Sequence, residues 1–141
     1  MDSRLTDLPV EASTSWFRIE GNRFYVPVSV AVAVLRYRLW DIDVLIGRDS
    51  SNAEYFSFRA TTLERIADLD YYGGDVVEAC ERYKEALDMQ HRAHALSTDD
   101  ADVMSGLSVS LQNVGWCLDF EDRAAEAIPI FEESIALQQR L

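Results

Sequence analysis

The stretch SNAEYFSFRATTLERIA, residues 51–67, gives the main indication of the fold, because a second stretch repeats its pattern 48 positions later, counted from 51 to 99. The second stretch is DDADVMSGLSVSLQNVG, residues 99–115. The aligned pairs agree in size and polarity: Asn52 with Asp100, Ala53 with Ala101, Leu63 with Leu111, Ile66 with Val114, and Ala67 with Gly115. Such agreement at a fixed offset indicates an internal repeat, whose units stack to bury a shared core.

The first unit predicts two helices joined by a glycine turn. Ser51 is followed three residues later by Glu54, which is the capping-box pattern of a helix start. This helix should run to about Tyr72, because Gly73-Gly74 can adopt the left-handed conformation that ends a helix. Asp75, again with a glutamate three residues later, should cap the second helix.

Apolar residues at spacings of three and four then mark the buried faces of the later helices. The predicted stripes are Val76, Cys80, Tyr83 and Leu87; then Leu107, Leu111, Val114 and Leu118; then Ile128, Phe131 and Ile135. The second helix should end near Leu96, and the turn of the second unit should be Glu121-Asp122. The last helix should reach Leu141, with Pro129 kinking it or moving its start.

Small residues recur where the paired helices would touch. They are Ala67 and Gly115, then Ala79 and Ala127, followed by the aromatics Tyr83 and Phe131 and by Ala86 and Ser134. Antiparallel helices approach closely only where side chains are tiny, and an aromatic ring can fill the hollow beside the pair. This pattern resembles the tetratricopeptide repeat family, and the segment LSVSLQNVG, residues 107–115, is similar to its long-repeat bacterial members.

The resemblance implies an all-α fold of antiparallel helix pairs, stacked as a short right-handed superhelix. Its units are residues 51–98 and 99–141. The 48-residue spacing exceeds the roughly 34 residues of the common form, which would lengthen each helix by about two turns. The second unit departs from the pattern because it has no glycine in its turn.

Residues 13–50 are interpreted as a degenerate first repeat or a capping segment, with a helix over residues 28–48. The supporting stripe is Val28, Val32, Leu35, Leu39, Ile42 and Ile46. The run VPVSVAVAV, residues 26–34, favours a strand instead. The alternative is therefore a hairpin in which WFRI and FYVPV flank Gly21-Asn22. Residues 1–12 are expected to form a flexible N-terminus.

The chain is acidic, with a net charge of −12 over 141 residues. Residues 51–141 hold seven bases and eighteen acids, so 7 − 18 gives about −11 there. Phosphates would be repelled, which argues against nucleic acid and anionic membranes and suits neutral or basic partners. The alternative interpretation is that the negative charge only keeps the protein soluble. With no signal peptide and with Cys80 and Cys117 interpreted as buried free thiols, we expect a cytoplasmic protein.

Residues that could perform chemistry are sparse. The sequence has no Ser/His/Asp order, phosphate loop or glycine fingerprint, so neither an enzyme nor a cofactor is expected. His91 and His94 lie three apart on a predicted helix, but two ligands make a poor metal site and a solvated helix face explains them. The remaining alternative is a small-molecule or enzymatic role within residues 13–50.

The resemblance implies a partner-binding groove, because the first helix of each pair lines the concave side of such stacks. The expected groove residues are Glu64, Arg65, Asp68 and Tyr72, then Gln112, Asn113, Trp116 and Asp119. Asn113 could hydrogen-bond an extended peptide, while Tyr72 and Trp116 could anchor side chains. Only Arg65 is basic, so the predicted scaffold would bind a neutral or basic peptide or protein.

Self-association is the alternative function. Stacked repeats need about three units to bury their faces, and this chain has two clear ones. Its last helix ends in IALQQRL, residues 135–141, with no capping helix after it. An open apolar flank is therefore expected at that end, and a homodimer through the terminal helix pair could cover it or Trp116.

Overall fold

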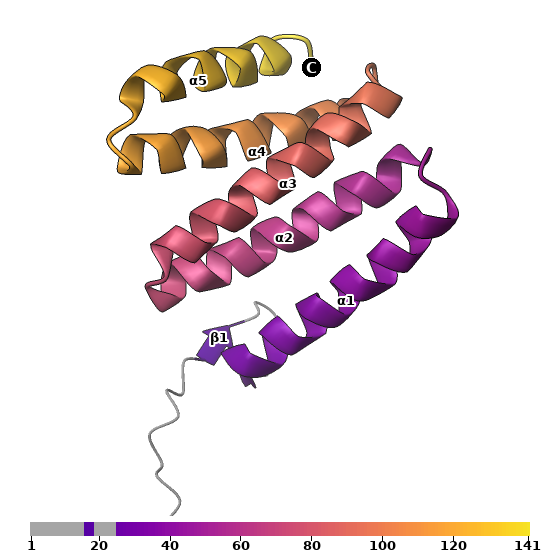
Figure 1. Ribbon diagram of the computed structural model, residues 1–141, viewed down its shortest axis with the longest axis vertical. Helices are drawn as coiled ribbons and strands as arrows, with labels where there is room; N and C mark the ends of the chain where they lie inside the picture. Colours follow the sequence, from indigo (N-terminus) through magenta and orange to yellow (C-terminus); the bar gives the residue numbers. More distant parts are fainter. Residues whose placement is uncertain (1–15, 19–24) are drawn as a thin grey trace, which may run out of the picture.

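The computed structural model describes residues 16–18 and 25–141, and five helices make up most of that part of the chain (Figure 1). They are α1 (Val28–Arg48), α2 (Ala53–Gly73), α3 (Val76–Leu96), α4 (Ala101–Phe120) and α5 (Ala124–Gln138). Each helix runs antiparallel to the one before it and packs against it. The expectation of an all-helical fold is confirmed. Residues 1–12, expected to be flexible, lie outside the described residues.

The region for which the sequence offers a helix or a hairpin contains a helix preceded by a short strand pair, while the predicted turn at Gly21-Asn22 lies outside the described residues. Helix α1 has the predicted bounds, residues 28–48. A short antiparallel pair precedes it, formed by β1 (Trp16–Arg18) and β2 (Tyr25–Pro27). Phe17 pairs with Val26. The strand-favouring run is therefore divided at Pro27, where β2 ends, and α1 begins at the next residue.

Local signals at the helix ends explain most of the boundaries. Asn52, and not Ser51, is the N-cap of α2, since its side chain accepts a hydrogen bond from the Glu54 amide. Gly74 ends that helix with φ 93°, a conformation that glycine adopts without steric cost. Asp75 caps α3 as predicted, and Asp100 caps α4 through the amides of Asp102 and Val103.

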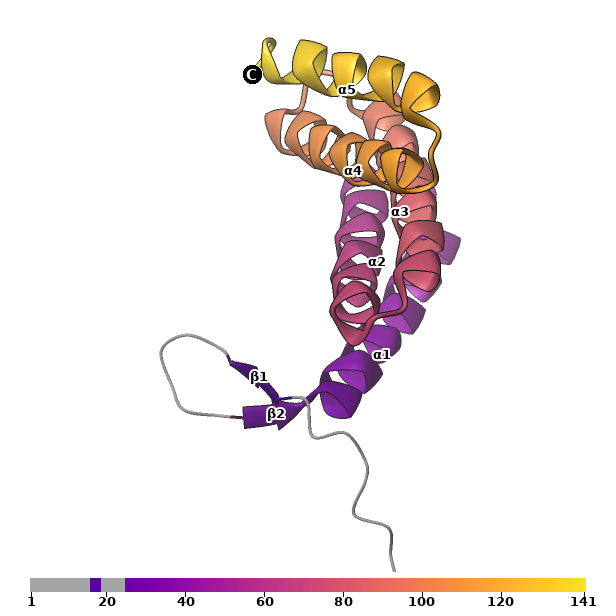
Figure 2. The same ribbon diagram turned by 90° about the vertical axis from the view of Figure 1, so that its left-hand side faces the viewer.

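The two helix pairs form successive layers (Figure 2). Helix α2 packs mainly on α3, and α4 mainly on α5, while α3 packs on α4 and α2 also contacts α4. The view in Figure 2 shows the α4–α5 layer turned relative to the α2–α3 layer. This leaves α2 and α4, the first helix of each pair, next to each other on one side of the stack.

Small residues lie where the helix pairs approach most closely. Ala67, Ala79 and Ala127 are buried in one cluster with Tyr83, as the repeat pattern predicted. Gly115 of α4 faces Phe131 of α5, so that a Cβ built on this glycine would stand 2.7 Å from the ring. The ring thus occupies the space that a side chain would need.

The buried face of α5 differs from the predicted one. Ile128 and Ile135 are 58% and 53% exposed, so two members of the predicted stripe point outward. The buried residues are Ala127, Ser134 and Leu137. The Ser134 hydroxyl lies 2.9 Å from that of Ser108 on α4, in a buried polar contact that fixes this face toward α4. The helix begins before Pro129 and ends at Gln138, short of Leu141.

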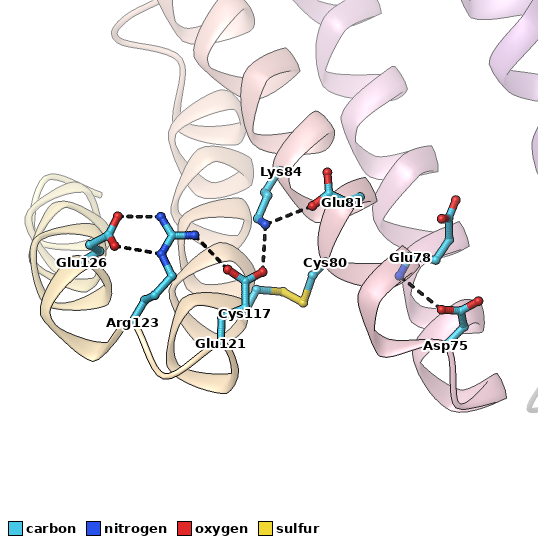
Figure 3. A network of polar contacts seen from close by, with 9 residues as sticks. All are labelled: Asp75, Glu78, Cys80, Glu81, Lys84, Cys117, Glu121, Arg123 and Glu126. Carbon is cyan, nitrogen blue, oxygen red and sulfur yellow. Dashed lines mark hydrogen bonds and ion pairs between the residues drawn. A yellow bond between two sulfur atoms is a disulfide. The ribbon is translucent and has the colours of Figure 1, made fainter.

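Cys80 of α3 and Cys117 of α4 form a disulfide, so the prediction of two free thiols is wrong (Figure 3). Their Cα atoms lie 5.6 Å apart, within the usual range of disulfides, roughly 4.4–6.8 Å. The residues are 37 positions apart in the chain, and only the packing of α3 against α4 joins them. Because disulfides persist mainly in oxidising compartments, the expected cytoplasmic location loses the support of free cysteines.

Candidate functional site

A pocket of about 240 Å³ lies between α2 and α4, on the side of the stack where the first helices of the two pairs meet. Its walls are formed by one acid, one amide and four aromatic side chains. They are Asp68, Tyr71, Tyr72, Tyr83, Asn113 and Trp116. Four of the eight predicted groove residues, Asp68, Tyr72, Asn113 and Trp116, are therefore brought together.

The inner wall of the pocket is held by a hydrogen bond between two helices. The hydroxyl of Tyr83, a buried residue of α3, donates to Asp68 Oδ1 of α2 at 2.6 Å. Burial and the neighbouring Asp68 carboxylate raise the pKa of the Tyr83 phenol above its ordinary value. The phenol consequently remains a donor at neutral pH and fixes the orientation of the carboxylate.

The aromatic rings continue from the pocket along its rim. Tyr71 lies edge-on to Trp116, with ring centroids 5.2 Å apart and planes at 87°. Phe120, one turn after Trp116 on α4, stacks with it at 5.8 Å and 20°. Tyr72 is 79% exposed and Trp116 is 38% exposed, so this aromatic band is accessible to a partner.

A second carboxylate lies one turn away from Asp68 on α2. Glu64 is partly buried and accepts a hydrogen bond from the Ser110 hydroxyl of α4. Burial raises the pKa of the Glu64 carboxyl, and the Asp68 charge adds to the increase, against the lowering effect of the Ser110 hydrogen bond. Two carboxylates, those of Glu64 and Asp68, therefore lie next to the pocket on this side of the stack, and the Arg65 charge is close enough to act on Glu64 in the opposite direction.

Four predicted groove residues do not line the pocket, and Glu64, described above, is one of them. Arg65 and Asp119 are exposed and lie outside it. Gln112 is turned toward α5, where its amide donates to the hydroxyls of Ser108 and Ser134 at 3.4 and 3.1 Å. The helical spacing alone could not show this, because the groove-facing arc of α4 depends on where α5 packs.

Sequence reasoning missed two residues of the pocket wall and one of its rim. The sequence pattern predicts only a packing role for Tyr83, although its hydroxyl reaches the pocket. The predicted groove includes Tyr72 but not its neighbour Tyr71, which also lines the pocket. Phe120 had a usable signal, because it follows Trp116 by four residues and shares its helix face.

The opposite, outer side of the stack has a different character. Lys84 of α3 contacts Glu121 at 2.9 Å, and Arg123 contacts both Glu121 and Glu126, beside the disulfide (Figure 3). These cations lower the pKa values of the Glu121 and Glu126 carboxyls. These charged side chains are partly or largely exposed. We therefore interpret them as a surface network of ion pairs that links α3 to the α4–α5 turn.

Metal ligands and membrane spans were searched for in the same part of the chain. Over residues 16–18 and 25–141, no three His, Cys, Asp or Glu residues gather where they could hold a metal ion. His91 is exposed and His94 is half-buried. None of the described helices has the length and apolar character needed to cross a bilayer.

Comparison with known proteins gives no family for this chain. No family model matches it, and no curated protein matches it either.

Proposed function

We propose that this protein is a non-catalytic interaction scaffold that binds an extended, neutral to basic segment of a partner protein between α2 and α4. The observation that carries the proposal is the pocket that gathers Asp68, Tyr72, Asn113 and Trp116 from these two helices. Exposed aromatic anchors around a small pocket are typical of the residues that dominate binding energy at interfaces. The amide of Asn113 supplies the polar group that an extended backbone would need.

We also propose that the helix pairs form a tetratricopeptide-like stack. Support comes from the buried small residues Ala67, Ala79 and Ala127 and from the close approach at Gly115. It comes as well from the neighbouring positions of α2 and α4, since a concave surface in such stacks is built from the first helices of successive pairs.

Selection from a random peptide library displayed on phage would test the scaffold function. We expect Trp116→Ala and Asn113→Ala to weaken the binding of the selected peptides. The far-ultraviolet circular dichroism of the protein should be unchanged. Trp40→Ala is the matched control, because Trp40 is 62% exposed on α1, away from the pocket. Binding that survives Trp116→Ala, or that Trp40→Ala reduces equally, would contradict the proposal.

Self-association is the second candidate, and exposed apolar residues at both ends of the stack favour it. On α5 these are Ile128 and Ile135. Helix α1 exposes a longer stripe, which consists of Val30, Val34, Tyr37, Trp40 and Val44. Large exposed apolar patches commonly mark association sites. A homodimer through the terminal pair α4–α5 would cover the first of these surfaces.

Light scattering coupled to size exclusion separates this candidate from the first. A homodimer at micromolar concentration that Ile128→Asp converts to a monomer would support association through α5. A monomer in the unmodified protein would exclude it at that concentration. Because Ile128 does not line the pocket, peptide binding should be unaffected by this substitution.

A further inference from the structure

The pocket between α2 and α4 combines a carboxylate with aromatic walls and contains no basic residue. Of the described side chains that line it, Asp68 is the only carboxylate, and none is a lysine or an arginine. The Glu64 carboxylate lies one helical turn from Asp68 and supplies a second negative charge, which the nearby Arg65 offsets in part. An anionic ligand would therefore be repelled, whereas a cation would be attracted to the site.

The rings face in different directions around the pocket. The planes of Tyr71 and Tyr72 meet at 66°, and those of Tyr71 and Trp116 meet at 87°. Rings at such angles meet edge to face, so their faces point in different directions. Aromatic faces attract cations through their quadrupole, tryptophan most strongly.

The two oxygens of the Asp68 carboxylate differ in their hydrogen-bond partners. Oδ1 accepts the hydrogen bond from Tyr83 at 2.6 Å. Among the described side chains, none donates a hydrogen bond to Oδ2. A planar guanidinium can stack on a ring and donate to a carboxylate oxygen at the same time, which a compact ammonium does less well.

The size of the pocket selects a side chain over a larger ligand. Its volume of about 240 Å³ falls below the roughly 300–1,000 Å³ of sites for drug-sized molecules. We propose that this pocket binds the guanidinium group of an arginine side chain presented by the partner segment. This inference rests on the proposed scaffold function and specifies which side chain of the partner segment the pocket binds.

Titration with two small probes tests the proposal. N-acetyl-arginine amide and N-acetyl-citrulline amide have nearly the same shape, but only the first is charged. The readout is the indole N–H signal of Trp116 in a nitrogen–proton correlation spectrum, assigned with Trp116→Phe. We expect the arginine probe to shift this signal saturably and to bind about tenfold more tightly than the citrulline probe. Equal binding of both probes, or no shift with either, would overturn the proposal.

Two pocket variants and one control sharpen the test. Asp68→Asn should reduce the affinity for the arginine probe about tenfold and leave the citrulline probe unchanged. Tyr72→Ala should also lower the affinity for the arginine probe. Because the Tyr72 side chain is highly exposed, this substitution should leave the protein folded. Asp88→Asn removes an equal charge from the exposed outer face of α3 and should have no effect. An equal loss of affinity for the arginine probe in Asp68→Asn and Asp88→Asn would show that net charge alone causes the loss. That result would overturn the proposed site.

Failure of this inference can be distinguished from failure of the scaffold function. If the phage library selects peptides that lack arginine yet require Trp116, the scaffold function stands and the arginine pocket does not. If no peptide is selected while the arginine probe still shifts the Trp116 signal, the cation site stands and the peptide function fails.

Discussion

The hydroxyl of Tyr83 donates a 2.6 Å hydrogen bond to Asp68, so one side chain belongs both to the core and to the candidate site. Its ring is buried with Ala67, Ala79 and the disulfide of Cys80, while its oxygen reaches the pocket. The packing between α2 and α3 thereby sets the position of the carboxylate. A core aromatic residue thus acquires a second role that its packing alone does not require.

Tyr83→Phe should separate these two roles. The ring stays in the core, but the hydrogen bond to a charged acceptor is lost, so the free energy of unfolding should fall by about 1.5 kcal/mol. Urea denaturation followed by circular dichroism measures this. Tyr37→Phe, at an exposed position of α1, is the control and should leave stability unchanged. Equal stability of Tyr83→Phe and the unmodified protein would contradict the assigned hydrogen bond.

The disulfide between Cys80 and Cys117 predicts the thiol content and a dependence of stability on reductant. Denatured protein kept without reductant should show no free thiol in an Ellman assay. Reduction should lower the free energy of unfolding by up to about 3–4 kcal/mol, the chain-entropy value for a loop of this length. The double variant Cys80→Ala/Cys117→Ala should be insensitive to reductant. Two reactive thiols before reduction would restore the free-cysteine interpretation.

The close contact between Gly115 and Phe131 predicts that substitutions at these two positions have coupled effects on stability. In Gly115→Ala the new methyl group would meet the ring, so the cost of overpacking should exceed the gain in helix propensity. We expect a net loss of about 1 kcal/mol in the free energy of unfolding. The loss should shrink when Phe131→Leu is already present, and a double-mutant cycle measures that coupling.

Gly47→Ala is the control for the same substitution without the contact. A Cβ at this position of α1 would meet nothing within 4 Å. Helix propensity alone should then act and raise the free energy of unfolding by about 0.5–1 kcal/mol. If both alanine variants stabilise the protein, the ring of Phe131 does not oppose a side chain at position 115, and the prediction is wrong.

The raised pKa of Glu64 predicts a pH-dependent contribution to stability. The folded state holds this proton more tightly than the unfolded chain, so the contribution is present below the ordinary pKa of 4.5 and is lost as pH rises through the folded value. Glu64→Gln should therefore stabilise the protein at neutral pH, and the gain should shrink in acid.

Denaturation with urea at neutral and at acidic pH measures this difference. The glutamine oxygen can still accept the hydrogen bond from Ser110, so the comparison isolates the charge. Glu132→Gln, at an exposed position of α5, is the control and should change stability little at either pH. A loss of stability at neutral pH in Glu64→Gln would show that the charged form is favoured in the folded protein.

Helix boundaries could be predicted from the sequence because they depend on interactions within a few residues. The cap at Asp75, the left-handed Gly74 and the bounds of α1 each follow from such local chemistry. The buried stripes of α3 and α4 follow as well, since their apolar residues occupy one arc. Four of the pocket residues could also be predicted, because the sequence pattern predicts α2 and α4 as the first helices of two successive pairs, and these helices do lie in contact.

The set of helices, their order and the buried faces of α3 and α4 therefore follow from local sequence. The remaining features come from the packing of the helices, because they depend on contacts between residues far apart in the chain. The approach at Gly115 and the Ser108–Ser134 contact turn Ile128 outward. The packing of α3 on α4 joins Cys80 to Cys117, and the reach of Tyr83 across to Asp68 completes the pocket. No periodicity along one helix encodes the angle and register at which a neighbouring helix packs.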